Sequence, residues 1–232
     1  MREICIVGRD ARADYAVQAL QDAGYRAMRI PLSEAEAYAA KGCMIVGGDL
    51  HEALGGLDYL KNEAFLYDNA RITAEGAVVL LGKSTCDTVF GRDVAVIGMG
   101  RIAECLCPLL RAFGARVTVY ARRDEALARA RAMGVGTVCF SGALPEEAAA
   151  HEIVCNTVPH VLYGRALLER ASCDTVLLEL ASAPGGFDMD AVSALELTYV
   201  NGQGLPGKYA PRAAGKLIAD FVIDALRREE HE

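Results

Sequence analysis

The chain has 232 residues, of which 53% are hydrophobic and 24% charged, and its formal net charge is -7 at pH 7. This length suits one or two domains with full hydrophobic cores, and the negative charge argues against a nucleic-acid partner. No apolar run reaches the roughly 18 residues of a membrane helix, and the N-terminus leads into a strand rather than a cleavable signal. We therefore expect a cytoplasmic protein that is not bound to a membrane.

The first predicted unit is a strand over residues 4–7, followed by a turn and a helix that Gly24 closes. Because this turn lacks the G-x-G-x-x-G spacing, it is better suited to presenting the side chains of Asp10 and Arg12 than to binding a pyrophosphate. Strands over 25–30 and 43–46, and a short helix opened by a Ser33/Glu36 capping box, follow it. These elements predict a small doubly wound domain, and a mostly apolar helix over 72–81 predicts its connection to a second one.

The most informative segment is an apolar strand at 94–97 that runs into G-x-G-x-x-A and then a helix. Gly98 allows the tight strand-to-helix turn, Gly100 lets the backbone approach a pyrophosphate, and Ala103 keeps helix and strand close. The phosphates would lie on the N–H groups of the helix N-terminus. We therefore predict dinucleotide binding by the turn, which comprises Gly98, Met99, Gly100, Arg101 and Ile102.

The end of the returning strand, predicted over 117–120, indicates which dinucleotide is bound. An acidic residue there would bond the ribose 2′-hydroxyl of NAD, but the chain reads Ala121-Arg122-Arg123. Two guanidinium groups suit a 2′-phosphate, so NADP is the predicted cofactor. The alternative is that the glycines and arginines only shape a structural βαβ unit with a solvated turn.

The second half continues as α/β, with a helix over 124–132 and strands over 135–140, 151–157 and 175–180. Ligands bind outside the carboxyl ends of such strands. The segments predicted around the nicotinamide are therefore 156–159, 181–186 and 201–204, and the residues predicted to bind the cofactor there are Asn156, Thr157, Pro159 and Ala181. The predicted fold is a Rossmann domain over 85–207 and a smaller flavodoxin-like α/β domain over 1–84, completed by a C-terminal helix over 208–232, with a cleft between them.

With these segments taken together, the chain resembles the dipicolinate synthase A-subunit family over essentially its whole length. The pieces that carry the resemblance are Gly8-x-Asp10-Ala11-Arg12, Asn69 with Thr73-x-Glu75-Gly76, the G-x-G-R turn, Ala121-Arg122, Asn156-Thr157-x-Pro159, Ala181-Ser182-x-Pro184-Gly185-Gly186, and Gly204-Leu205-Pro206-Gly207 followed by Ala210-Pro211 and Gly215. The resemblance implies an architecture shared with D-2-hydroxyacid dehydrogenases. The chain departs from the pattern between Ile30 and Cys43, where its N-terminal domain is shorter.

The resemblance implies that dihydrodipicolinate, or its hydrated precursor, is oxidised to dipicolinate in sporulating bacteria. Such a dicarboxylate needs cations, and Arg12 is the first candidate because a guanidinium matches a carboxylate bidentately. Ser182, the N–H groups of Gly185 and Gly186, Lys208 and Arg212 are candidates for the second anchor. Asp10 or Glu75 would take the ring proton if desolvation raised its pKa. The alternatives are a helix cap or surface group for each carboxylate, and a salt bridge between the domains for Arg12.

Two other functions are compatible with the sequence. A D-2-hydroxyacid dehydrogenase needs a histidine held by a carboxylate and an arginine on the substrate. His160 lies near the predicted nicotinamide but lacks such companions, so a generic NADP-dependent 2-hydroxyacid or imino-acid oxidoreductase is the second choice. A non-catalytic NADP-binding protein is the third. The resemblance implies a flavoprotein partner, the dipicolinate synthase B-subunit, and we also expect a homo-oligomer.

The eight cysteines are scattered, mostly within apolar segments, and none form a C-x-x-C pair. Buried free thiols account for this pattern best, and we expect neither a metal site nor a disulfide framework.

Overall fold

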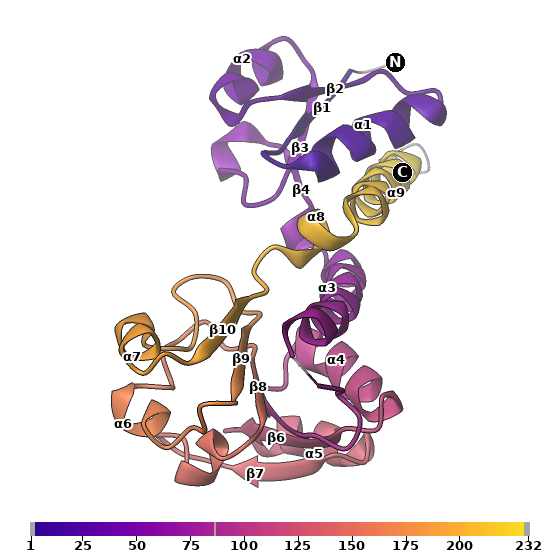
Figure 1. Ribbon diagram of the computed structural model, residues 1–232. Helices are drawn as coiled ribbons and strands as arrows, with labels where there is room; N and C mark the ends of the chain where they lie inside the picture. The colour runs from indigo at the N-terminus through magenta and orange to yellow at the C-terminus, as the bar shows by residue number, and fades with distance from the viewer. Residues whose placement is uncertain (1–2, 86, 230–232) are drawn as a thin grey trace. The chain divides into compact units, whose positions relative to one another are not determined.

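The computed structural model describes residues 3–85 and 87–229, which fold as two compact units (Figure 1). Unit 1 consists of Met1–Ile72 and Pro206–Glu232, and unit 2 of Thr73–Leu205. Each unit has its own parallel β-sheet with helices on both faces, as the predicted α/β class requires. The hydrophobic cores are therefore separate.

Unit 1 contains a sheet of order β2-β1-β3-β4 in which all neighbouring strands are parallel. Its strands are β1 (Ile4–Val7), β2 (Ala27–Ile30), β3 (Met44–Gly47) and β4 (Leu57–Asp58). Its helices are α1 (Ala11–Asp22), α2 (Ala35–Ala40) and α9 (Pro211–Glu229). The two-residue β4 was not predicted, because it is too short to give a periodic signal.

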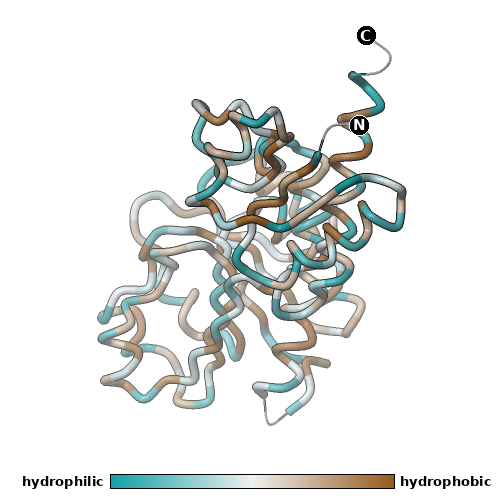
Figure 2. Tube along the Cα trace, turned by 90° about the horizontal axis from the view of Figure 1, so that it is seen from above, coloured by the Kyte–Doolittle hydropathy of each residue, from teal (hydrophilic) through white to brown (hydrophobic). Residues whose placement is uncertain are grey.

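Alternation along β1 distributes its side chains between the two faces of the sheet. Ile4 and Ile6 pack into a core with α1 and α9, whereas Cys5 packs on the other face with α2. The segment leading to the C-terminus alternates between hydrophobic and hydrophilic colours in Figure 2, as expected for the amphipathic helix α9. The predicted helix over 208–232 is therefore part of unit 1, starting at Pro211 after the short helix α8 (Leu205–Tyr209).

Unit 2 contains a six-stranded parallel sheet of order β10-β9-β8-β5-β6-β7. Counted from its first strand this is the order 6-5-4-1-2-3 of a Rossmann fold, which confirms the predicted fold class. The strands are β5 (Asp93–Ile97), β6 (Arg116–Ala121), β7 (Gly136–Cys139), β8 (Ile153–Asn156), β9 (Val176–Glu179) and β10 (Thr198–Asn201). The helices are α4 (Arg101–Ala112), α5 (Asp124–Ala132), α6 (Arg165–Leu168) and α7 (Met189–Ala194).

The central strand β5 has every side chain from Val94 to Ile97 fully buried, because helices cover both faces of the sheet. Val94 and Val96 pack with residues of α3, α4 and α5, and Ala95 and Ile97 with residues of α6 and α7. The same two layers are visible on either side of the unit 2 sheet in Figure 1. This packing fixes the end of β5, where the glycine turn begins.

Two details of the predicted elements are wrong. Helix α3 runs over Glu63–Ser84, nine residues earlier than the predicted start, because the Asn62 side chain accepts a hydrogen bond from the N–H of Phe65 (2.8 Å) and begins it there. The predicted capping box is absent: a 3-10 turn over Leu32–Glu34 comes first, and α2 begins at Ala35 without a side-chain cap.

The boundary between the units lies at Ile72/Thr73, inside the continuous helix α3, whereas the sequence boundary was placed at residue 84. Among the described residues, no helix is both long and apolar enough to span a membrane.

Candidate dinucleotide site

The glycine turn at the end of β5 has the geometry that phosphate binding requires. Gly98 has a φ of +91°, and a Cβ there would lie 2.8 Å from Thr157 Oγ1 and from Val158 Cγ2. Gly100 is the N-cap of α4, and a Cβ on Gly100 would meet nothing within 4 Å. The first glycine is therefore needed for close packing, while the space beside the second is open for a ligand at the helix N-terminus.

An arginine from another helix holds this turn in place. Arg129 of α5 donates from Nη2 to the carbonyl of Met99 (3.1 Å) and from Nε to Oε1 of Glu104 in α4 (2.7 Å). Ala103 is fully buried beneath the turn. Sequence reasoning missed Arg129, because only the fold brings it next to the turn.

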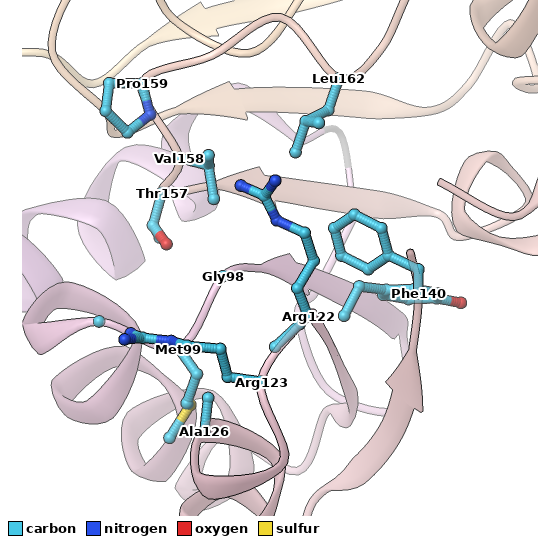
Figure 3. A pocket seen from close by; sticks show the side chains of 13 residues that line it. Gly98, Met99, Arg122, Arg123, Ala126, Phe140, Thr157, Val158, Pro159 and Leu162 are labelled. Carbon is cyan, nitrogen blue, oxygen red and sulfur yellow. The ribbon is translucent and has the colours of Figure 1, made fainter. Parts of the chain in front are cut away.

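The turn forms one wall of a pocket of about 430 Å³ (Figure 3). The lining residues are Gly98, Met99, Gly100, Tyr120, Ala121, Arg122, Arg123, Ala126, Phe140, Thr157, Val158, Pro159 and Leu162. The side chains of Arg122 and Arg123 are exposed, and within the described part of the chain neither guanidinium has an ion-pair partner. Apolar walls beside two free cations suit an adenosine that carries phosphate groups.

The predicted cofactor residues divide into two groups. Those that line the pocket are Gly98, Met99, Gly100, Ala121, Arg122, Arg123, Thr157 and Pro159. The others are placed differently: Arg101 is exposed on the first turn of α4, Ile102 packs against the core, and Ala181 and Asn156 are buried. These four residues do not line the pocket.

The side chain of Asn156 is occupied by internal hydrogen bonds. Its Nδ2 donates to the carbonyl of Val158 (2.9 Å) and to Oε1 of Glu179 (2.7 Å), while its Oδ1 accepts from the N–H of Val158 (3.2 Å). Thr157 also donates from Oγ1 to the carbonyl of Ile97 (2.7 Å). Asn156 therefore shapes the Thr157–Pro159 segment from behind instead of facing the pocket.

Unit 1 has a pocket of its own, of about 1320 Å³, beside the carboxyl ends of β1, β2 and β3. Asp10 and Arg12 both line it and form a close pair: Arg12 donates from Nε to Oδ1 (2.9 Å) and from Nη2 to Oδ2 (2.8 Å). Asp10 Oδ1 also accepts from the N–H of Arg12 (3.0 Å) and caps α1. Arg12 thus forms a salt bridge within unit 1, and both members of the pair line the pocket.

The pKa of Asp10 is lowered, chiefly by the hydrogen bond from Arg12. The condition set for Asp10 as a proton acceptor, a pKa raised by desolvation, is therefore not met, because a close cation outweighs its partial burial. A carboxylate of this kind orients Arg12 instead of taking up a proton.

The other predicted substrate residues lie elsewhere. Glu75 is an exposed residue of α3 in unit 2, and Ser182 is exposed in the loop after β9. The N–H of Gly185 donates to the Ser182 carbonyl (3.0 Å), and that of Gly186 to Oε2 of Glu179 (2.6 Å). The backbone anchor predicted at these two glycines is therefore wrong, since both groups already have acceptors.

The cysteines are less uniformly buried than expected. Cys5, Cys43, Cys107 and Cys155 are buried, Cys105 is half-buried, Cys139 and Cys173 are exposed, and Cys86 lies outside the described residues. The two exposed thiols lie at the end of β7 and shortly before β9, where each strand meets a surface loop.

Comparison with known proteins defines the class. Residues 67–177 match the family model "D-isomer specific 2-hydroxyacid dehydrogenase, NAD binding domain". This range includes the whole βαβ unit around the glycine turn. The Rossmann order, the glycine turn and this match together indicate a domain that binds a nicotinamide dinucleotide, of the kind found in D-2-hydroxyacid dehydrogenases.

The similarity to a particular enzyme is also confirmed. The chain is 32% identical over 164 residues to the dipicolinate synthase A-subunit of Bacillus subtilis (strain 168), a match that covers 71% of this chain and 55% of that protein. The crystal structure of the dipicolinate synthase A-subunit from Bacillus halodurans matches with a TM-score of 0.83 and 22% identity, over 97% of this chain and 98% of that one. D-lactate dehydrogenase from Escherichia coli shares the fold, with a TM-score of 0.71 and 12% identity, over 99% of this chain and 98% of that one.

Proposed function

We propose that the protein is an NADP-dependent oxidoreductase that converts dihydrodipicolinate, or its hydrated precursor, to dipicolinate during sporulation in the cytoplasm. The observation that carries the cofactor choice is the end of β6, where Arg122 and Arg123 are free and no acidic residue follows Ala121 directly. The similarity to the dipicolinate synthase A-subunit supports the substrate.

The residues that line the pocket in unit 2 suggest how the cofactor would be oriented there. Arg122 and Arg123 would hold the 2′-phosphate, the N-terminus of α4 the pyrophosphate, and the segment Thr157–Pro159 would face the nicotinamide. Ser182 and Ala181 follow the neighbouring strand β9, so their loop would lie on the nicotinamide side. NADP, when bound, accepts the hydride.

The oxidation of dihydrodipicolinate removes two hydrogens from the substrate ring, and the hydrated precursor has to lose a water molecule as well. One leaves with its electron pair as a hydride, the other leaves as a proton to a base, and the ring becomes aromatic. Arg12, oriented by Asp10, would bind one carboxylate of the substrate in unit 1. In unit 2, Ser182 is proposed separately as a contact for a substrate carboxylate, and Glu75, being exposed, stays the candidate proton acceptor.

A second candidate function is non-catalytic binding of NADP within a larger enzyme. It is favoured by the lowered pKa of Asp10, which removes one of the two candidate bases. The flavoprotein B-subunit of dipicolinate synthase is the proposed partner in either case, and self-association of the chain is proposed alongside it. Activity of the purified chain, measured with and without that flavoprotein, distinguishes the two functions.

Thermal unfolding in the presence of NADP, NAD or dipicolinate tests the ligands directly. A ligand that binds only the folded chain stabilises it by about 2.7 kcal/mol at a concentration of 100 Kd. We expect NADP and dipicolinate to raise the Tm and NAD to raise it much less at equal concentration. If NAD raised it as far as NADP, the cofactor choice would be wrong. If dipicolinate had no effect, the substrate would be wrong.

A further inference from the structure

A buried carboxylate joins the two loops at the carboxyl ends of β8 and β9. Glu179, the last residue of β9, is 1% exposed and is the parallel register partner of Asn156 on β8. Its Oε1 accepts from Asn156 Nδ2 (2.7 Å) and from the N–H of Ala181 (2.8 Å). Its Oε2 accepts from the N–H of Gly186 (2.6 Å). One side chain thus ties the segment after β8 to both ends of the loop after β9.

The surrounding backbone is fitted closely to this carboxylate. A Cβ on Gly185, which has a φ of +84°, would lie 2.7 Å from Glu179 Oε2, and a Cβ on Gly186 would overlap the side chain of Asn156. The loop can therefore approach Glu179 only because both residues are glycines. Close packing against Glu179 and Asn156 therefore explains why residues 185 and 186 are both glycines, without any role in binding a phosphate or a carboxylate.

The donors around Glu179 require a carboxylate rather than an amide. All three contacting groups donate, so each oxygen of the side chain has to accept. A glutamine would place its NH2 group against Gly186 in one orientation, or against Ala181 and Asn156 in the other. Burial raises the pKa of Glu179, and the donors of Gly186, Asn156 and Ala181 counter this by lowering it.

Asn156 connects Glu179 to the pocket wall through hydrogen bonds. Because Glu179 accepts a hydrogen bond from Asn156 Nδ2, the orientation of the Asn156 amide is fixed. Its Oδ1 then accepts from the N–H of Val158, and Val158 lines the pocket. The Cβ that Gly98 lacks would lie against Thr157 and Val158, so a shift of this segment would also alter the glycine turn. The position of Val158 thus depends on a carboxylate that lies outside the pocket.

We propose that Glu179 is a positioning residue that holds the Thr157–Pro159 segment and the Ala181–Gly186 loop in register, so that together they form the surface facing the nicotinamide. The inference rests on the proposed placement of the nicotinamide at these strand ends. It assigns a role to a residue that touches neither cofactor nor substrate.

The test compares a whole dinucleotide with a fragment that lacks nicotinamide. Calorimetry of wild type and Glu179→Gln would use NADPH, NADH and 2′-phospho-ADP-ribose, with thermal unfolding of each protein recorded alongside. We expect Glu179→Gln to weaken the tighter dinucleotide by about tenfold to a hundredfold, since misplaced contacts have effects of this size. The fragment should bind within about twofold of wild type.

Glu169→Gln is the matched control, because Glu169 is an exposed carboxylate of unit 2 whose side chain is 50% exposed. It should leave both affinities unchanged. If Glu179→Gln does not unfold cooperatively, Glu179→Asp takes its place, since it keeps the charge but has a shorter side chain. We again expect weaker binding of the dinucleotide and unchanged binding of the fragment. Equal loss for dinucleotide and fragment, or no loss for either, would overturn the positioning role.

The same titrations of wild type show separately whether the proposed function fails. If wild type binds NADH as tightly as NADPH, the proposed cofactor is contradicted. The role of Glu179 is then tested by comparing the NADH affinities of wild type and Glu179→Gln. A wild type that binds no dinucleotide more tightly than the fragment contradicts the nicotinamide placement, and the role of Glu179 is contradicted with it.

Discussion

At the residue scale, we expect the choice between NADP and NAD to depend on the turn after β6. Replacing Arg122 with Ala should weaken NADP binding by roughly 1.5–3 kcal/mol, the usual contribution of a hydrogen bond to a charged group, and leave NAD binding nearly unchanged. Calorimetric titration measures both affinities. Arg131→Ala is the control, since Arg131 is an exposed arginine of α5 that does not line the pocket. Equal losses for NADP and NAD would rule out recognition of the 2′-phosphate.

The second residue prediction concerns Gly100. A valine there would extend into the open space at the start of α4, where the pyrophosphate is proposed to lie, so Gly100→Val should abolish dinucleotide binding while the circular dichroism stays normal. Gly164→Val is a matched control: Gly164 is also an N-cap glycine of unit 2 with nothing within 4 Å of its Cβ position. Retained cofactor affinity in Gly100→Val would contradict the assigned turn.

Residues with a local signal were predictable from the sequence, and residues that act across the fold were not. Gly98 and Gly100 could be predicted because strand, turn and helix are consecutive in the chain. Arg129 and Glu179 act on partners 30 and 23 residues away, on other elements. Nothing in their own neighbourhood marks them, so only the folded chain shows their role.

At the element scale, the loop before β8 contains a half-buried histidine, His151, that we expect to make stability depend on pH. His151 Nε2 lies 2.8 Å from the hydroxyl group of Tyr120 on β6, and burial lowers the pKa of His151 below its ordinary value of 6.5. The unfolded chain therefore takes up this proton before the folded one. The contribution of His151 to stability is complete above pH 6.5 and is lost as the pH falls through the lower, folded pKa.

Denaturant unfolding measured on either side of pH 6.5 checks this contribution. His151→Gln should reduce the loss of stability on acidification, whereas His160→Gln, at an exposed histidine, should follow wild type. Identical pH dependence in wild type and His151→Gln would show that the histidine does not titrate differently on folding.

Elements were predictable where the apolar period was strong. The helix predicted over 124–132 coincides with α5, and the last helix begins at Pro211, three residues after the predicted start at 208. The first turns of α3 were missed because their exposed residues, including Tyr67 and Arg71, interrupt the apolar pattern. Capping at α2 failed because the 3-10 turn after Pro31 moves the helix start past Ser33.

At the scale of the whole molecule, the proposed function predicts cofactor binding by unit 2 and a carboxylate contact at Arg12 of unit 1. Arg12→Ala should weaken dipicolinate binding about tenfold to a hundredfold, the equivalent of one charge-assisted contact, without changing NADP affinity. Arg26→Ala, at an exposed arginine of the same unit that does not line the pocket, is the control. Unchanged dipicolinate affinity in Arg12→Ala would leave Asp10–Arg12 as a structural ion pair only.

The central claim is that this chain transfers a hydride from a cyclic dicarboxylate to NADP. The most direct measurement mixes the purified chain with dihydrodipicolinate and NADP, with and without the flavoprotein partner, and follows NADPH absorbance together with dipicolinate formation. We predict that both products appear in equal amounts with wild type and that Gly100→Val forms neither. If wild type binds NADP but no NADPH accumulates under either condition, the oxidation is contradicted and the chain binds NADP without turning it over.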